Sequence, residues 1–515
     1  MQWMTAKCAG GVHSAKAPGM QHICELLDDL ATRLPDRPAI VAPNGEQRTF
    51  RELHERAAQV SGRLDSLGVG RHVLLLIPVG IPLYEILLGV FWGGRTAVLV
   101  DPSLPQERLN AALECVGIDS FIAIPKGHLL RLKVSSLRGL DRYLSTRSLG
   151  PFARSIWGGK PGQRRLPDGD EPALLTFTTG TTGVPKAMGR GHGFLLAQHD
   201  LLAGHMGLSA DDVDLPTLPV FLLNSLAVGA TCVLPDGDLR DVAGLSPAVL
   251  TQQVRTHNVT TSSGSPGFFA PWVKWLLAEH QTLPELTKLF TGGARVPASL
   301  LRDMQTVFPS AKIEVLYGST EAEPMASINA VTVLAETAQR ELAGEGTCVG
   351  APVPGLAVRL VDPDSGQDVS EGPGEVWVSG DHVNQGYYNN ADADHANKVN
   401  DGERVWHRTG DAAWRDESGR LWLVGRTSAR VGALYSFPTE TQVEALVGVD
   451  RAALIDLNGH AVLAFSGVAD VVDVQPLVPD ARVIHLKSMP VDPRHRAKID
   501  RVVLRELLLG QRPPL

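Results

Sequence analysis

The sequence predicts an α/β protein built from a large N-terminal domain and a smaller C-terminal one. Over the first two thirds of the chain, short apolar runs alternate with helical segments, which is typical of mostly parallel sheets covered by helices on both faces. From about Gly346 the pattern changes to short β-like runs such as LAVRLV and GEVWVSG, separated by Pro and Gly turns. This change predicts a small β subdomain at the end of the large domain.

The first clear element is a helix over residues 48–68. Thr49 and Glu52 form a capping box, apolar residues recur at helical spacing, and Gly68 ends the segment. The runs that follow predict, in order, a strand at 73–77, a helix at 83–92, and strands at 96–100, 174–177, 230–234, up to Gly292 and at 313–316.

A domain boundary is predicted directly after GRLWLVGR, which ends at Arg426. This stretch is typical of a hairpin strand followed by a junction, and the residues after it suffice for a small α+β domain with its own core. We therefore predict domains at 1–426 and 427–515.

Composition excludes several classes of protein. Apolar residues make up 43% and charged residues 20%, as in a soluble globular protein. The 48 Lys and Arg against 56 Asp and Glu argue against a nucleic-acid partner. The five cysteines are odd in number and far apart, so we expect buried, reduced thiols in an intracellular protein, without disulfides or a zinc site.

No transmembrane segment or signal peptide is predicted. The most apolar stretch, 73–92, contains Pro78, Pro82 and Glu85, which would leave polar groups unsatisfied in lipid. We therefore expect a cytoplasmic protein, and peripheral attachment to a membrane stays open.

The stretch LLTFTTGTTGVPKAMGRGH, residues 174–192, places glycines and hydroxylated residues at the end of an apolar run. Backbone N–H groups and Thr hydroxyls at a strand end can surround an anion, and Lys186 adds a positive charge. The stretch does not fit the common phosphate loop, because Pro185 precedes Lys186 and Ala187 follows it. By composition alone, a phosphate site and an ordinary Thr/Gly-rich turn both remain open.

The order of residues from Thr178 to Lys186 resembles the signature loop of the adenylate-forming superfamily, which comprises acyl-CoA synthetases, peptide-synthetase adenylation domains and luciferases. Further segments resemble this superfamily in its order: GGARVP (292–297), YGSTE (317–321), HRTGD (407–411), GRLWLVGR (419–426) and PRHRAKIDR (493–501). The resemblance implies the superfamily's fold, including a mobile C-terminal domain. It also implies ATP-dependent activation of a carboxylic acid as an acyl-AMP.

The resemblance implies a set of site residues. Lys186 and the loop residues would hold the β- and γ-phosphates of ATP; these loop residues are Thr178, Thr179, Gly180, Thr181, Thr182 and Gly183. Glu321 would bind Mg²⁺, a hard cation suited to carboxylate and phosphate oxygens. Residues that would line the nucleotide and acid sites are Gly293, Ala294, Arg295, Tyr317 and Gly318, with Tyr317 stacked on adenine.

Four further positions follow from the resemblance. Asp411 would accept hydrogen bonds from the ribose hydroxyls with help from Arg426. Lys186, Thr320 and Lys498 would act in catalysis, with Lys498 reaching the carboxylate and α-phosphate oxygens from the small domain, where negative charge gathers in the transition state.

Three departures from the thioester-forming pattern concern the fate of the acyl-AMP. Thr427 to Arg430 stand where acyl-CoA synthetases have an acidic hinge, Leu222 stands where many ligases have a gating His, and Ala497 precedes Lys498 where Gly is usual. Four segments resemble instead the β-lactone synthetases of bacterial olefin and β-lactone natural-product biosynthesis: 121–132, 214–236, 317–328 and 490–499. This resemblance implies a small-molecule β-hydroxy acid substrate whose own hydroxyl attacks the acyl carbon.

The sequence leaves more than one function open. The protein is interpreted as a β-lactone synthetase, with an acyl-CoA or carrier-protein ligase and a catalytically inactive nucleotide-binding scaffold as the competing hypotheses. No base for the hydroxyl is assigned to any histidine, and Asn224 and Ser225 are candidate hydrogen-bond partners only. The walls of the acid pocket are predicted at 222–226, 262–269 and 292–294. Association with other enzymes of the same biosynthetic pathway is a further expectation.

Overall fold

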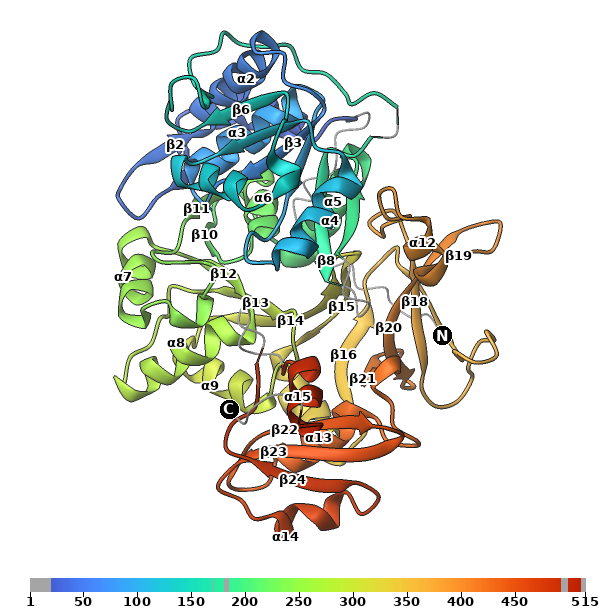
Figure 1. Ribbon diagram of the computed structural model, residues 1–515. Coiled ribbons are helices and arrows are strands. Elements are labelled where there is room, and N and C mark those ends of the chain that lie inside the picture. Colours follow the sequence, from blue (N-terminus) through green and yellow to red (C-terminus); the bar gives the residue numbers. More distant parts are fainter. Residues whose placement is uncertain (1–19, 170, 180–184, 492–498, 511–515) are drawn as a thin grey trace, which may run out of the picture.

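The fold is mixed α/β, with three sheets in the part of the chain that the structure describes (Figure 1). It was obtained as a computed structural model, which describes residues 20–169, 171–179, 185–491 and 499–510. A seven-stranded sheet lies in the upper lobe of Figure 1, a long sheet runs through the middle, and a three-stranded sheet lies at the bottom. The predicted α/β class is confirmed.

The seven-stranded sheet has the order β7-β6-β5-β3-β4-β8-β9 and is parallel except for the β8–β9 hairpin. Its strands are β3 (His72–Leu76), β4 (Thr96–Leu99), β5 (Ser120–Ala123), β6 (Arg142–Ser145), β7 (Arg154–Ser155), β8 (Leu174–Thr179) and β9 (Pro185–Arg190). The helical elements of this lobe are α1 (Cys24–Arg33), α2 (Phe50–Ser66), α3 (Ile81–Trp92), α4 (Gln106–Val116), η1 (Pro125–Leu132) and η2 (Ser135–Leu137).

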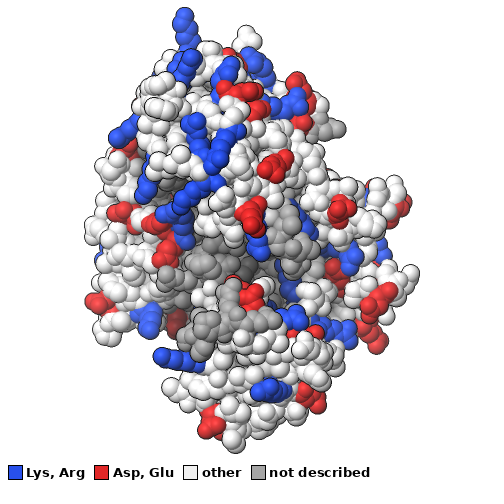
Figure 2. Space-filling model, viewed as in Figure 1, with Lys and Arg blue, Asp and Glu red and all other residues white. Residues whose placement is uncertain are grey.

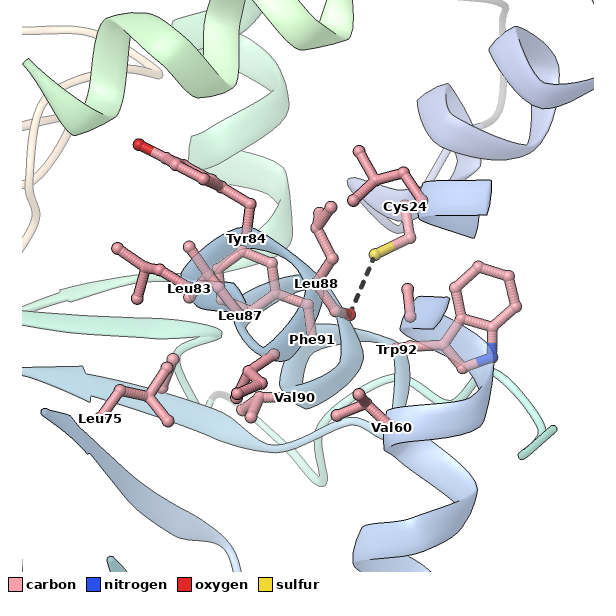
Figure 3. Close-up of a cluster of buried hydrophobic side chains, with 14 of the residues drawn as sticks. Cys24, Val60, Leu75, Leu83, Tyr84, Leu87, Leu88, Val90, Phe91 and Trp92 are labelled. Atoms are coloured by element: carbon pink, nitrogen blue, oxygen red, sulfur yellow. Dashed lines mark hydrogen bonds between the residues drawn. The ribbon is translucent and has the colours of Figure 1, made fainter. Parts of the chain in front are cut away.

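Helices α2 and α3 pack closely because of one glycine. A Cβ atom at Gly89 would lie 2.4 Å from Val60 Cγ1, so only glycine lets the two helices approach this far. Helix α3 is buried almost all round, as its apolar sequence predicts, and Figure 3 shows Tyr84, Leu87 and Phe91 within the cluster it forms. Its one carboxylate, Glu85, is paired with Arg48 at 2.8 Å. The capping box of Thr49 and Glu52 is formed as predicted.

The long sheet begins with a parallel half that carries the order β14-β13-β12-β10-β11-β1. These strands are β1 (Pro38–Val41), β10 (Val213–Pro216), β11 (Thr231–Val233), β12 (Thr261–Gly264), β13 (Lys288–Gly292) and β14 (Lys312–Ser319), with β2 (Gln47–Thr49) antiparallel at the edge. Helical elements around it are α5 (His192–Met206), α6 (Pro219–Ala227), η3 (Val242–Gly244), α7 (Pro247–His257), α8 (Pro266–Ala278), α9 (Ala298–Val307), α10 (Ala330–Thr332), η4 (Val333–Thr337) and α11 (Ala338–Leu342). Trp272 of α8 is fully buried among the aromatic rings of this core.

An antiparallel half continues the same sheet. Its strands are β15 (Ala322–Asn329), β16 (Thr347–Pro352), β17 (Ala357–Val361), β18 (Gly374–Ser379), β19 (Lys398–Asn400), β20 (Val405–Arg415) and β21 (Leu421–Arg426), with α12 (Ala391–Asn397) between β18 and β19. β16 pairs with both β15 and β21, and β15 pairs with β14, so the predicted β subdomain is hydrogen-bonded to the parallel half through β15. β20 and β21 form the predicted hairpin.

The three-stranded sheet follows β21 and has its own core. The elements are η5 (Thr427–Ala429), α13 (Ser436–Glu444), β22 (Val449–Leu457), β23 (His460–Gly467), α14 (Val471–Val474), η6 (Gln475–Leu477), β24 (Arg482–Leu486) and α15 (Arg501–Leu508). Val443, Leu463 and Phe465 are buried between α13 and this sheet. The division of the chain at 426/427 stays a prediction, and β21 ends at that residue.

The cysteines of the described ranges are mostly buried. Cys24, Cys232 and Cys348 are buried free thiols, whereas Cys115 is only partly buried; Cys8 lies outside the described residues. Among the described helices, none combines the length and apolar character needed to cross a bilayer.

Candidate active site

The β8–β9 hairpin presents the signature loop. Thr178 lies opposite Lys186 in the hairpin, so strand pairing fixes the two sides of the loop. The loop residues 180–184 lie outside the described residues, and of Thr179 only the backbone is described. The phosphate-binding roles predicted for this loop stay predictions.

Tyr387 connects the signature-loop lysine to the predicted metal ligand. Its hydroxyl donates a 3.0 Å hydrogen bond to Glu321 Oε1, and Lys186 Nζ lies 5.3 Å from the centre of its ring. Lys398 Nζ lies 5.4 Å from the same ring. Two cations and one carboxylate therefore meet around a single aromatic side chain, which is an arrangement suited to a polyphosphate and its metal ion.

The carboxylate of Glu321 is held ionised. Burial by itself would raise its pKa, but the hydrogen bond from the Tyr387 hydroxyl and the charge of Lys398 favour the ionised form, and the pKa lies below its usual value. Burial lowers the pKa of Lys398 to about 8, against the attraction of Glu321. Burial likewise lowers the pKa of His407 to about 4, so the ring is neutral near pH 7.

The residues at Glu321 fit a magnesium ion held mainly by substrate. Mg²⁺ in phosphate-transfer sites is usually bound by one or two carboxylates, with phosphate oxygens and water as the other ligands. Glu321 is one ionised carboxylate between two lysines. Among the described residues, no three His, Cys, Asp or Glu side chains gather as a ready metal cage.

The residues predicted to hold adenine and ribose meet on β14, β20 and β21. The Tyr317 hydroxyl donates a 2.7 Å hydrogen bond to Asp411 Oδ2, and Arg426 Nε lies 3.3 Å from Asp411 Oδ1. Burial and the neighbouring Asp411 carboxylate raise the pKa of Tyr317 well above its usual value, so it stays a donor. Asp411 is thus fixed in orientation by two partners from different strands.

Arg190 holds the turn that contains Thr320. Its Nη1 donates to Thr176 Oγ1 at 2.8 Å, and its Nη2 donates to the Thr320 carbonyl at 3.0 Å. Burial lowers the pKa of this arginine only to about 10, so it remains charged. The side chain therefore ties strand β8, which leads into the signature loop, to the turn between β14 and β15. The Thr320 side chain itself is exposed.

Glu323 is a carboxylate near Arg190, on the β15 side of the Thr320 turn. A Cβ atom at Gly318 would lie 3.3 Å from Glu323 Cγ, so the Glu323 side chain covers the Gly318 backbone. Burial raises the pKa of Glu323 to about 7, partly offset by the charge of Arg190. Gln198 of α5 donates to the Glu323 carbonyl at 3.1 Å.

The Arg295 side chain is engaged with α13. Its guanidinium donates to Thr441 and forms an ion pair with Glu444, both on α13. The side chain thus connects the loop after β13 to the C-terminal part of the chain. The neighbouring Gly293 has a left-handed φ of +77°, and Ala294 follows it in the same loop. The binding roles predicted for the backbone of Gly293, Ala294 and Arg295 stay predictions.

The predicted acid pocket has polar groups in a mainly apolar wall. On α6, Leu222 and Leu226 are buried, whereas Asn224 Oδ1 lies 2.9 Å from His199 Nδ1 of α5. Ser225 is also buried and donates a 2.6 Å hydrogen bond to Asp214 Oδ2. Asn224 and Ser225, predicted as partners for substrate, are thus engaged with protein groups.

Lys498 lies outside the described residues, so its catalytic role stays a prediction. Arg190, Glu323, Tyr387 and Lys398 are residues that sequence reasoning missed. Arg190 at the end of the mostly buried strand β9 was a usable signal, because buried arginines need partners. Lys398 lies in the segment HANKVN, which matches no motif and gave no signal of a role in the site.

Comparisons with known proteins identify the family of this chain. Residues 27–388 match the model of the AMP-binding enzyme family. The olefin beta-lactone synthetase of Stenotrophomonas maltophilia is 31% identical over 93% of this chain and 96% of its own. The amide bond synthetase McbA of Marinactinospora thermotolerans has a similar structure, with a TM-score of 0.80 at 21% identity over 94% of this chain and 99% of its own. ATP-bound MatB of Rhodopseudomonas palustris gives 0.77 at 19% identity over 95% and 99%. With its signature-loop hairpin, its Tyr317–Asp411 pair and a family match over most of its length, this chain belongs to the AMP-binding enzyme family.

Proposed function

We propose that this protein is an ATP-dependent β-lactone synthetase. It converts a β-hydroxy acid and ATP into an acyl-AMP and pyrophosphate, and the β-hydroxyl then attacks the acyl carbon to give the β-lactone and AMP. The observation that carries this proposal is the 31% identity to an olefin beta-lactone synthetase over nearly the full length of both chains. A cytoplasmic location and association with enzymes of the same pathway belong to the proposal as well.

In the first half-reaction, the chain must neutralise a triphosphate and orient the acid. Lys186 and the signature loop would hold the terminal phosphates, Tyr317 would pack on adenine, and Asp411 would accept from the ribose. Glu321 would hold Mg²⁺, which supplies neutralisation of phosphate charge. Support comes from the Tyr387 hydrogen bond and the nearby Lys398, which keep Glu321 ionised.

Thr320 and Lys498 act at the α-phosphate in this proposal. The Thr320 turn is held by Arg190, so its position does not depend on substrate. Lys498 supplies a positive charge where the acid carboxylate and the α-phosphate oxygens gather charge in the transition state. Removing such a donor costs on the order of 10²- to 10³-fold in rate.

In the second half-reaction, the nucleophile is part of the substrate. Intramolecular attack needs a folded acyl chain and the exclusion of water rather than a tunnel for a second substrate. Leu222 and Leu226 supply an apolar wall on α6. Thr427 to Arg430 in place of an acidic hinge support a reaction without coenzyme A.

The decisive experiment supplies ATP, Mg²⁺ and a 3-hydroxy acid with and without coenzyme A, and identifies products by mass. We expect a product one water lighter than the acid in both reactions. The matched acid without the 3-hydroxyl serves as control, because it is activated but cannot close the ring. If AMP is released only when coenzyme A is present, and the product is a thioester, the protein is an acyl-CoA ligase instead. The variant K498A should lose activity with either acid.

A further inference from the structure

Residues 125–160 carry a concentration of positive charge that the rest of the chain lacks. This segment contains a single acidic residue, Asp141, although acidic residues outnumber basic ones in the whole sequence. Its basic residues are Lys126, Arg131, Lys133, Arg138, Arg142, Arg147, Arg154 and Lys160. None of them forms a salt bridge with another residue of the described ranges. No described carboxylate therefore neutralises this charge in an ion pair, although the guanidinium groups of Arg131, Arg138 and Arg142 donate to backbone carbonyls.

Three large apolar side chains protrude from the same segment. Leu129 is 59% exposed, Leu132 73% and Phe152 72%. A single exposed apolar residue is ordinary on a protein surface, but a group of them set among cations is not. We call these three side chains, together with the eight basic residues, the basic apolar surface.

Hydrogen bonds keep the charged and apolar parts of this surface together. Arg131 Nη1 donates to the Phe152 carbonyl at 3.2 Å, and Arg138 Nη2 donates to the Leu132 carbonyl at 2.6 Å. The Arg131 guanidinium also stacks 3.6 Å above the Tyr143 ring. The protruding Leu132 and Phe152 are thus held beside the two arginines by links between η1, η2 and the turn before β7.

The basic apolar surface lies away from the candidate active site. It is formed by η1, η2, β6 and β7, and β7 is the edge strand opposite the β8–β9 hairpin in the seven-stranded sheet. Figure 2 shows many Lys and Arg side chains over the upper lobe, with a smaller number of Asp and Glu among them. A partner bound there leaves the signature-loop hairpin accessible.

We propose that the basic apolar surface docks the protein on a membrane rich in anionic lipids. Apolar side chains surrounded by cations are the pattern of proteins that lie on a bilayer, because the apolar tips enter the interface while the cations face anionic headgroups. The contact is peripheral, since no described helix is able to cross a bilayer. This inference does not depend on the reaction proposed above.

The test is co-sedimentation of the full chain with vesicles of phosphatidylcholine alone or mixed equally with phosphatidylglycerol. We expect binding to the mixed vesicles that weakens with salt, and little binding to phosphatidylcholine alone. The charge-reversing pair K126E/K133E should weaken binding by about tenfold or more. The pair L132S/F152S should weaken it as well, without any change in charge.

Matched controls carry the same substitutions elsewhere on the surface. K274E/K487E reverses two exposed lysines, and V447S/V468S polarises two exposed apolar residues on the C-terminal domain. These controls should bind vesicles as the unmodified chain does, and all variants should keep acid-dependent exchange of pyrophosphate into ATP.

Several outcomes overturn the proposal. One is absence of binding to the mixed vesicles, and another is binding that both surface pairs retain. A third is a solution dimer that the surface pairs dissociate without any vesicle binding, because the surface would then join two copies of the chain. Capture of an acidic protein by this surface in the absence of vesicle binding would likewise replace the membrane as the partner.

Discussion

The Tyr317 hydroxyl donates a 2.7 Å hydrogen bond to Asp411, whose other carboxylate oxygen faces Arg426. These residues are far apart in the chain, on β14, β20 and β21. The pairing orients a carboxylate that, in the proposed function, accepts from the ribose of ATP. Preorganisation of this kind lowers the cost of ordering the site when nucleotide binds.

Tyr317→Phe tests this orientation. The ring that would pack on adenine remains, and only the hydrogen bond to Asp411 is lost, at a cost of about 1 kcal/mol. We expect KM for ATP to rise roughly 2- to 10-fold with little change in kcat, measured by acid-dependent pyrophosphate exchange. An unchanged KM for ATP would contradict the role assigned to the hydroxyl. D411N should have a larger effect in the same assay.

Arg190→Met tests the link between the signature-loop strand and the Thr320 turn. The substitution leaves the Thr320 carbonyl and the Thr176 hydroxyl without their donor, so pyrophosphate exchange should fall by roughly 10- to 100-fold. T176V removes only one of the two contacts and should have the smaller effect. Exchange at the unmodified rate in a folded R190M protein would show that the turn is held by other contacts. R190K should recover part of the exchange, which a loss due to packing alone would not predict.

Arg295→Met tests the connection between the loop after β13 and α13. Arg295 is bound to Thr441 and Glu444, so its loss should loosen α13 from the loop after β13 and expose the segment that follows Arg426. Trypsin cleavage at the exposed Arg430 should become several-fold faster. R482M, an exposed Arg→Met change on β24, is the matched control and should leave the cleavage rate unchanged. Equal rates in both variants would contradict the connection.

The stacked pair His22 and His192 predicts an acid-sensitive fold. Their rings lie 3.9 Å apart, and burial lowers the pKa of His22 to about 4 and that of His192 to about 3. Below pH 6.5 the unfolded chain takes up protons that the folded chain does not, so stability falls as pH decreases. Each histidine contributes a slope of about 1.4 kcal/mol per pH unit in that window.

The slope is measured by urea unfolding between pH 7 and pH 5. His192→Phe keeps an aromatic ring and removes one titrating group, so the slope should be shallower. His395→Phe, at an exposed position on α12, should keep the original slope. A slope that H192F leaves unaltered would assign the acid sensitivity to other groups.

Local features of the fold were readable from the sequence because they depend on neighbours in the chain. The capping box at Thr49 follows from residues three positions apart, and the alternation of strands and helices follows from apolar spacing. The order of the signature segments also identified the AMP-binding enzyme family. Hydrogen-bond geometry and side-chain period act over short separations, so these features need no knowledge of tertiary contacts.

Only the tertiary structure decided which distant side chains meet. It brought Tyr387 and Lys398 to Glu321, joined Arg190 to Thr320, and turned Arg295 toward Glu444. These contacts depend on how β14, β20 and α13 are placed by the packing of whole sheets, and that placement leaves no local pattern in the sequence. The sequence therefore determined the family and most of the elements, whereas packing determined the partners of the charged groups.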